Sequence, residues 1–144
     1  MKPIKICAAQ SIVSKDFNKN IGSAEKFFKI ANKKNCDIIC FPEIFLTGPL
    51  NRENYDSKIP AISKKSFSRL SKEYGIYSVM GSVIERANGH FYNVSYLFDS
   101  KGSIYGSYKK NHLVQKSEAG YLTSGNEVPV SSTRVCLQPP TPQE

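Results

Sequence analysis

Asp37-Ile38-Ile39-Cys40-Phe41-Pro42-Glu43 is the stretch that decides the class of fold predicted for this chain. Its residues from Ile38 to Phe41 are apolar without polar alternation, which is typical of a strand buried on both faces of a parallel sheet. Pro42 fixes the backbone after the strand, so Glu43 is held in place at the strand's carboxyl end. Ligands bind at that end of open α/β sheets. The stretch therefore predicts an α/β protein with a carboxylate at a position suited to a site.

The segments on either side predict the order β-α-β-α-β-β-β. The expected elements are a strand near Ile4–Ala8, a helix over Phe17–Asn35, a strand over Asp37–Phe41, a helix over Pro60–Glu73, and strands over Ile76–Ile84, Phe91–Phe98 and Ile104–Tyr108. Both helices carry apolar residues at helical spacing. Asn88-Gly89 between two strands is a hairpin signal. This order predicts a largely parallel sheet with an antiparallel extension.

The composition is that of a globular protein with one domain. The chain has 144 residues, of which 40% are hydrophobic and 22% are charged, so it can bury a sizeable core. No apolar run approaches the length that spans a bilayer. The start, Met1–Cys7, is too short and too charged for the apolar core of a signal peptide. We expect a cytoplasmic protein with no membrane partner.

The net charge of +8 raises the alternative of a nucleic-acid partner. The basic pairs Lys33-Lys34, Lys64-Lys65 and Lys109-Lys110 are far apart in the sequence. No run combines basic residues with stacking aromatics. We therefore interpret the charge as a solvated lysine-rich surface and expect no nucleic-acid binding.

The four cysteines and two histidines do not predict a metal site. Cys36 and Cys40 do not have the spacing of zinc ligands, and neither His90 nor His112 has a companion at ligand spacing. A cytoplasmic setting also argues against disulfides.

Three charged residues are candidates for a site. Glu43 could act as a general base, although a carboxylate that only solvates a loop is a common alternative. Lys110 follows the last expected strand, so its ammonium can share a rim with Glu43 and stabilise an oxyanion, or it can belong to a plain basic loop. Glu118 could hold that ammonium or position a substrate, but taken alone it is better interpreted as a surface-loop residue. For His112 we favour a structural hydrogen-bonding role over a catalytic one.

Several segments, taken in order, are similar to those of one known family. They are Cys7–Gln10, Cys40–Gly48, Met80–Arg86, Gly89–Asn93, Asp99–Gly102, Tyr108–Leu113 and Gly125–Val130. Together they resemble the nitrilase superfamily, the Cys-Glu-Lys carbon–nitrogen hydrolases. No single segment is specific, but the ordered set is.

The resemblance implies a four-layer α-β-β-α sandwich, of which this chain is a truncated N-terminal part. It implies that Glu43 is the general base, that Lys110 stabilises the oxyanion, and that Glu118 is the second glutamate of amidase-like members. Asn93 and Tyr108 match positions around the site. The implied reaction is thiolate attack on an amide or nitrile carbon, formation of an acyl-enzyme and its release by water. The intact family member would take a small amide, nitrile or carbamoyl substrate, would need no cofactor and would form a homo-oligomer.

The chain departs from the family near its end. The resemblance places the nucleophilic Cys near positions 140 to 142, which are Pro140-Thr141-Pro142 in this sequence. Cys136 comes too early and lacks a preceding strand, so we expect no catalytic role for it. We expect residues 1–133 to be the N-terminal part of a hydrolase domain and residues 134–144 to be a disordered Pro-rich tail.

Two functions follow from this departure. The first is a carbon–nitrogen hydrolase fragment that is inactive as this chain. The second is a non-catalytic relic that serves as a binding or interaction module. In both, Glu43 and Lys110 should lie at salt-bridge distance, with Glu118 near the lysine.

Overall fold

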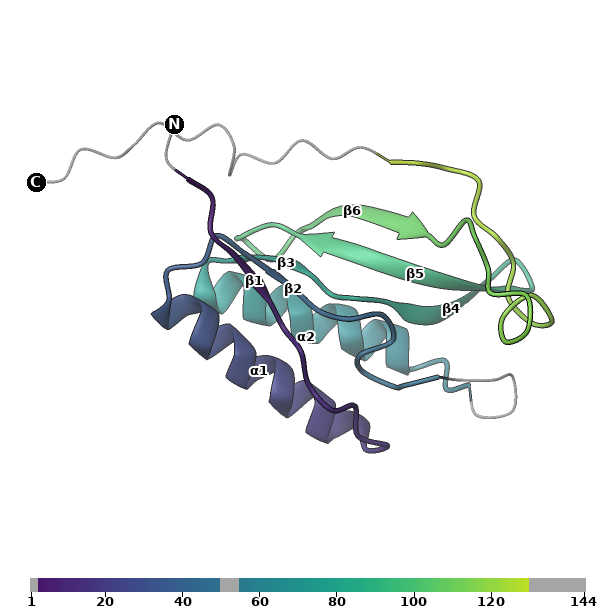
Figure 1. Cartoon of the computed structure of the whole chain (residues 1–144), viewed down its shortest axis with the longest axis horizontal. Helices are drawn as coiled ribbons and strands as arrows, with labels where there is room; N and C mark the ends of the chain where they lie inside the picture. Colours follow the sequence, from purple (N-terminus) through teal and green to yellow (C-terminus); the bar gives the residue numbers. More distant parts are fainter. Residues whose placement is uncertain (1–2, 50–54, 130–144) are drawn as a thin grey trace, which may run out of the picture.

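The computed structural model describes residues 3–49 and 55–129 of the chain. In these residues two helices cover one face of a six-stranded sheet (Figure 1). The elements are β1 (Ile6–Ala8), α1 (Phe17–Lys33), β2 (Ile38–Cys40), α2 (Ile59–Tyr74), β3 (Tyr77–Val79), β4 (Val83–Ala87), β5 (His90–Phe98) and β6 (Ile104–Lys109). The predicted α/β class is confirmed. The Pro-rich tail and Cys136 lie outside the described residues.

The sheet has a parallel part and an antiparallel part. In the parallel part, β2 lies between β1 and β3, and Ile39 pairs with Cys7 on one side and Ser78 on the other. In the antiparallel part, β5 pairs with β3 and β4 along one edge and with β6 along the other. The turn between β4 and β5 is the predicted hairpin, and Asn88 and Gly89 both have positive φ there (50° and 82°).

One predicted strand is wrong in its extent. The segment expected to be a single strand over Ile76–Ile84 is two strands, β3 and β4, separated at Met80–Ser82. Gly81 in the gap has φ +81°, and a Cβ atom on it would collide with the carbonyl oxygen of Pro42. Only glycine adopts this conformation and allows this approach without strain. The break therefore brings the chain after β2 against the chain between β3 and β4.

The core lies between the sheet and the two helices, and it is rich in phenylalanine. Phe28 of α1 and Phe67 of α2 are fully buried. Phe41, which follows β2, packs edge-on against Phe67 with ring centroids 5.0 Å apart. Such aromatic contacts add to the free energy gained by burial. This layer supports the end of β2 from below in the view of Figure 1.

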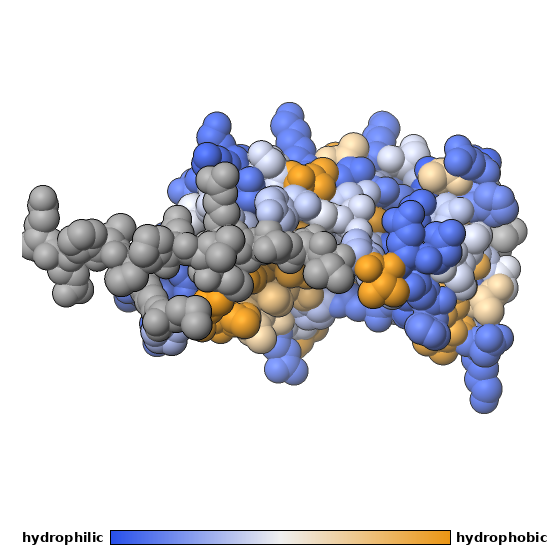
Figure 2. Space-filling model, turned by 90° about the horizontal axis from the view of Figure 1, so that it is seen from above, coloured by the Kyte–Doolittle hydropathy of each residue, from blue (hydrophilic) through white to orange (hydrophobic). Residues whose placement is uncertain are grey.

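The opposite face of the sheet has no helix over it among the described residues. Alternate residues of the strands face this side, so Val79 and Leu97 are only half-buried there. At the sheet edges Ile6 is 63% exposed and Ile104 is 51% exposed. Figure 2 looks onto the molecule from above Figure 1 and shows apolar side chains in orange between hydrophilic ones. In the described ranges no helix is both long and apolar enough to cross a membrane.

Candidate active site

Glu43 lies on a turn that is held by the break between β3 and β4. The turn starts where the backbone N–H of Phe41 donates to the carbonyl of Val79 at 3.0 Å. Ile44, directly after Glu43, has φ +50°, which is unusual for a β-branched residue. Its N–H donates to the Ser82 hydroxyl oxygen at 3.1 Å. This hydrogen bond offsets the backbone strain and fixes the direction in which Glu43 leaves the chain.

The far side of the same turn is anchored to α1. The Asn20 side chain is buried and donates to the carbonyl of Leu46 at 2.8 Å. The same amide also donates to the Ser14 carbonyl and accepts from the Ser14 N–H, both at 2.8 Å. Because Phe45 and Leu46 are fully buried, the turn that carries Glu43 is fixed on both sides.

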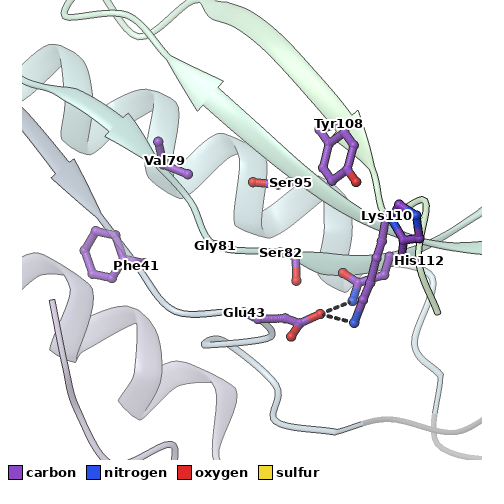
Figure 3. Close-up of a pocket in the computed structure, with 10 residues that line it drawn as sticks. Phe41, Glu43, Val79, Gly81, Ser82, Ser95, Tyr108, Lys110 and His112 are labelled. Carbon is purple, nitrogen blue, oxygen red and sulfur yellow. Dashed lines mark hydrogen bonds and ion pairs between the residues drawn. The ribbon is translucent and has the colours of Figure 1, made fainter. Parts of the chain in front are cut away.

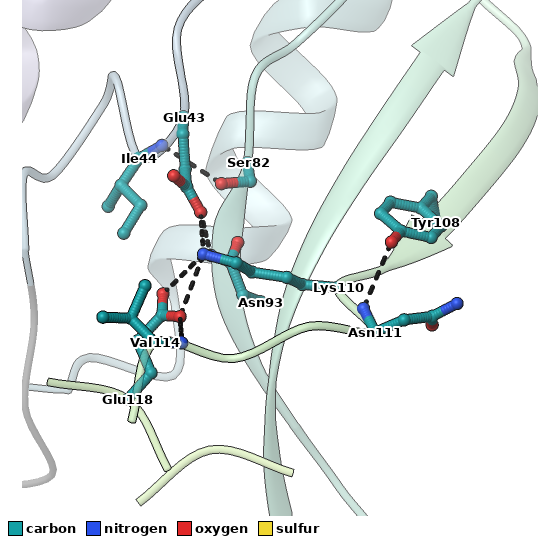
Figure 4. Close-up of polar contacts among 9 residues, drawn as sticks. All are labelled: Glu43, Ile44, Ser82, Asn93, Tyr108, Lys110, Asn111, Val114 and Glu118. Carbon is teal, nitrogen blue, oxygen red and sulfur yellow. Dashed lines mark hydrogen bonds and ion pairs between the residues drawn. The ribbon is translucent and has the colours of Figure 1, made fainter. Parts of the chain in front are cut away.

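Lys110 reaches the same place from the end of β6. Its backbone N–H donates to the Asn93 carbonyl at 2.9 Å, which continues the β5–β6 pairing. Its Nζ lies 2.9 Å from Glu43 Oε1 and 2.9 Å from Glu118 Oε2 (Figures 3 and 4). The predicted proximity of the three residues is therefore confirmed, while their catalytic roles remain predictions.

Glu118 is a buried carboxylate that also holds its own loop. It is 7% exposed, and its Oε2 accepts from the Val114 N–H at 2.8 Å. Burial alone would raise the pKa of Glu118. The hydrogen bonds from Val114, Lys110 and Asn93 outweigh burial and lower that pKa. Glu118 is thus an ionised partner for the ammonium, and the alternative of a plain surface-loop residue is wrong.

The Lys110 ammonium is stabilised in its charged form. Burial alone would lower the pKa of Lys110, but the hydrogen bonds and charges of Glu43 and Glu118 outweigh it and raise that pKa. One ammonium between two carboxylates gives the cluster a net charge of −1. An ammonium held in this way can face a developing negative charge without losing its proton.

Asn93 on β5 belongs to the same cluster. Its Nδ2 donates to Glu43 Oε1 at 2.7 Å, and the residue is 2% exposed. The resemblance placed Asn93 near the site, but no pattern in the sequence predicted this hydrogen bond. The sequence carried no signal for it, because the burial of both Asn93 and its neighbour Val94, on opposite faces of the strand, is seen only in the structure.

The cluster borders an open cavity of about 450 Å³. The cavity is lined by Phe41, Glu43, Val79, Gly81, Ser82, Asn93, Ser95, Tyr108, Lys110 and His112 (Figure 3). Its size and its mixture of apolar and polar walls suit a small organic molecule. Cys7, Cys36 and Cys40 are the described cysteines, and none of them lines it. Residues 3–49 and 55–129 contain no group of three or more His, Cys, Asp or Glu that could hold a metal ion.

Sequence comparison finds related proteins over nearly the whole chain. The family model for carbon–nitrogen hydrolases matches residues 5–138. An omega-amidase of Xenopus laevis is 30% identical over 146 residues, which cover 94% of this chain and 53% of that protein. The 2-oxoglutaramate amidase of Bacillus subtilis is 35% identical over 114 residues, which cover 76% and 43%.

Comparison with solved structures finds the same fold. An amidase from Nesterenkonia sp. superposes with a TM-score of 0.82 at 18% identity, over 90% of this chain and 51% of that one. A carbon–nitrogen hydrolase from Helicobacter pylori gives a TM-score of 0.77 at 23% identity, over 85% and 45%. The chain spans about half the length of the curated relatives that it matches first.

Proposed function

This chain belongs to the carbon–nitrogen hydrolase family, and we propose that Glu43, Lys110 and Glu118 form the acid–base part of a site that hydrolyses small amides. One observation carries the proposal. Lys110 Nζ lies between the two carboxylates, 2.9 Å from each, beside a cavity of small-molecule size. The names of the omega-amidase and the 2-oxoglutaramate amidase support an amide as the substrate.

Glu43 is the general base in this proposal. Its side chain is 54% exposed and lines the cavity, so it can reach a proton on a thiol or a water molecule. In the first step the base takes the thiol proton while the thiolate attacks the amide carbon. The same proton then passes to the departing nitrogen, which leaves as ammonia or an amine. In the second step Glu43 takes a proton from the water that attacks the thioester. The C–S bond then breaks, the departing thiolate takes that proton back from Glu43, and the product is a carboxylic acid.

Lys110 stabilises the negative charge that the carbonyl oxygen acquires. The Nζ contacts Glu43 Oε1 and both oxygens of Glu118. An ammonium has three N–H donors, so when the two Glu118 oxygens share one of them, one is left for the oxyanion. Glu118 keeps the ammonium charged and aimed, because it is buried and tied to the Val114 backbone.

The proposed mechanism also needs a thiol, and none of the described cysteines lines the cavity. We therefore propose that the 144-residue polypeptide alone does not hydrolyse amides measurably, because losing the nucleophile removes most of the rate enhancement of a catalytic set. The alternative, a binding or interaction module without chemistry, makes the same prediction for this polypeptide. The two proposals differ in what they predict when a nucleophile is supplied, because only the hydrolase should then turn over amides.

The experiment supplies that nucleophile. Residues 1–133 are joined to the second half of the Bacillus subtilis 2-oxoglutaramate amidase, and ammonia release from small amides is measured. We expect turnover by the chimaera, and we expect Glu43→Gln and Lys110→Ala each to abolish it. The control Glu73→Gln, which removes an exposed carboxylate paired with Arg69 on α2, should leave turnover unchanged.

Two results would contradict the proposal. A folded chimaera without turnover would favour the binding module. Hydrolysis by the 144-residue chain that Cys136→Ala stops would show that the nucleophile is already present.

A further inference from the structure

We propose that Asn93 is a positioning residue that makes the two oxygens of Glu43 unequal, so that Oε2 is the atom that accepts the proton. This inference rests on the proposed function, in which Glu43 is the base. It goes beyond that function because it assigns the reactive atom and the residue that selects it.

Asn93 is in contact with all three members of the cluster. Its side chain donates to Glu43 Oε1 at 2.7 Å, and its backbone carbonyl accepts from the Lys110 N–H at 2.9 Å. A hydrogen bond from its side chain also contributes to the lowered pKa of Glu118. Figure 4 shows Asn93 beside the Lys110 Nζ, close to both carboxylates.

The position of Asn93 is fixed by strands on both sides. In β5 it pairs with Ile84 of β4, and its neighbour Val94 pairs with Lys109 of β6. A residue in the middle of three strands cannot shift without breaking the sheet. Its amide is therefore a rigid reference point for the more exposed Glu43 carboxylate.

Among residues 3–49 and 55–129, the hydrogen bonds that Glu43 accepts are all on one oxygen. Oε1 accepts from Asn93 Nδ2 at 2.7 Å and from Lys110 Nζ at 2.9 Å. Oε2 has no hydrogen-bond partner among the described residues. The last torsion of a glutamate is broad and two-fold, so a carboxylate without a fixed neighbour exchanges its oxygens freely. Asn93 and Lys110 together hold Oε1 and leave the lone pairs of Oε2 for a proton at the cavity.

The oxygen of the same amide gains no hydrogen bond at this position. Asn93 Oδ1 is buried and has no partner within the described part of the chain. A buried acceptor without a partner destabilises the fold, and an apolar residue of similar size would avoid this. What distinguishes Asn93 is therefore its donor, which contacts the carboxylates.

The first test uses the 144-residue chain and the NMR signals of its side-chain amides. The Asn93 NH₂ signals should move as the carboxylates are protonated, and most of this movement should disappear in Glu43→Gln. The Asn111 NH₂ signals are the control. Like Asn93, Asn111 has a buried Oδ1 without a partner among the described residues. Its side chain, however, donates to the Glu127 carbonyl and points away from the carboxylates (Figure 4). Asn93 signals that respond equally in Glu43→Gln and in the parent would overturn the inference.

The second test uses kinetics in the chimaera described above. Asn93→Leu should lower kcat by about 10- to 100-fold with KM nearly unchanged, because it displaces a catalytic group without removing it. Asn111→Leu, the matched change, should leave both values near those of the parent. Asn93→Leu also removes a donor to the buried Glu118 and should lower the unfolding midpoint, so a fall in kcat at temperatures where the variant is fully folded separates positioning from a structural role.

The outcomes of the two tests are distinguishable. Unchanged kcat in Asn93→Leu would overturn the inference and leave the proposed function intact. A chimaera without turnover would refute the proposed function, and the amide signals would still decide whether Asn93 holds Glu43. If Asn93→Leu does not fold, Asn93→Asp keeps the shape and replaces the donor with an acceptor, and a kcat equal to that of the parent would again overturn the inference.

Discussion

Gly81 is the residue on which the geometry of the site depends most. It has φ +81° and touches the Pro42 backbone, and Pro42 precedes Glu43. Gly89 has nearly the same dihedral, +82°, but no atom lies within 4 Å of where its Cβ would be. The two glycines therefore separate backbone strain from steric collision.

Gly81→Ala should destabilise the protein far more than Gly89→Ala. Forcing an L-residue into the left-handed region costs about 1–2 kcal/mol, which applies to both variants. The collision with Pro42 should add about 1–3 kcal/mol or more in Gly81→Ala alone. Urea unfolding of both variants measures the difference. An equal decrease in the free energy of unfolding in both would show that the collision with Pro42 does not add to the destabilisation.

Glu118 should make the stability of the fold depend on pH on the acid side. Its pKa is lowered in the folded state, so its contribution is complete above the unfolded value of about 4.3 and is lost as the pH falls through the lower folded value. Lys110 affects stability on the alkaline side. Because its pKa is raised in the folded state, its contribution to the free energy of unfolding is lost only as the pH rises above about 10.4.

Glu118→Gln should therefore reduce the free energy of unfolding by about 1–3 kcal/mol at neutral pH and flatten its decrease below pH ~5. Urea unfolding at a series of pH values tests this, with Glu73→Gln as the exposed control. A parent and a variant with parallel pH profiles would contradict the role given to the buried carboxylate.

At the scale of elements, the sequence predicted what local patterns determine. Helical spacing located α1 and α2 to within two residues at each end, and Asn88-Gly89 located the β4–β5 hairpin. The break at Met80–Ser82 was not predicted because its cause is a contact with Pro42, which is distant in the sequence. A glycine within a run of strand-forming residues was the one local sign of it.

The start of α1 provides a prediction at this scale. Asp16 is its N-cap, and the carboxylate accepts from the N–H groups of Asn18 and Lys19. Asp16→Ala should cost about 1 kcal/mol, while Asp16→Asn, which keeps an acceptor oxygen, should cost much less. Thermal unfolding of the two variants checks this. A loss of similar size in both would mean that charge, and not the capping hydrogen bond, stabilises the helix.

At the scale of the whole molecule, the site was predictable only in part. Glu43 and Lys110 both follow strands, so their shared edge could be inferred from the parallel order and the resemblance. Asn93 lies within a strand, and its role depends on which face of β5 meets the turn after β2. That relation depends on the packing of the complete sheet, which no local pattern in this sequence encodes.

The open face of the sheet leads to a prediction for the 144-residue polypeptide. Its apolar side chains and the edge strands β1 and β6 can pair with a second copy. We expect the 144-residue chain to self-associate or aggregate in sedimentation experiments as its concentration rises. Ile104→Lys should reduce this, because a charge on the edge strand opposes pairing. A compact monomer with a cooperative thermal transition at all concentrations would contradict the prediction.

The join between the parallel and antiparallel parts of the sheet is narrow. Two residue pairs connect β3 to β5, Ser78 with Phe98 and Val79 with Leu97, and one further hydrogen bond runs from the Met80 N–H to the Tyr96 carbonyl at 2.9 Å. Glu43 belongs to the parallel part, whereas Asn93 and Lys110 belong to the antiparallel part. Hydrogen–deuterium exchange can show whether the two parts open as separate cooperative units. If they do, the site is assembled only in molecules in which this join, the seam between β3 and β5, is paired. The free energy of opening the seam, rather than that of global unfolding, would then set the fraction of molecules with an assembled site.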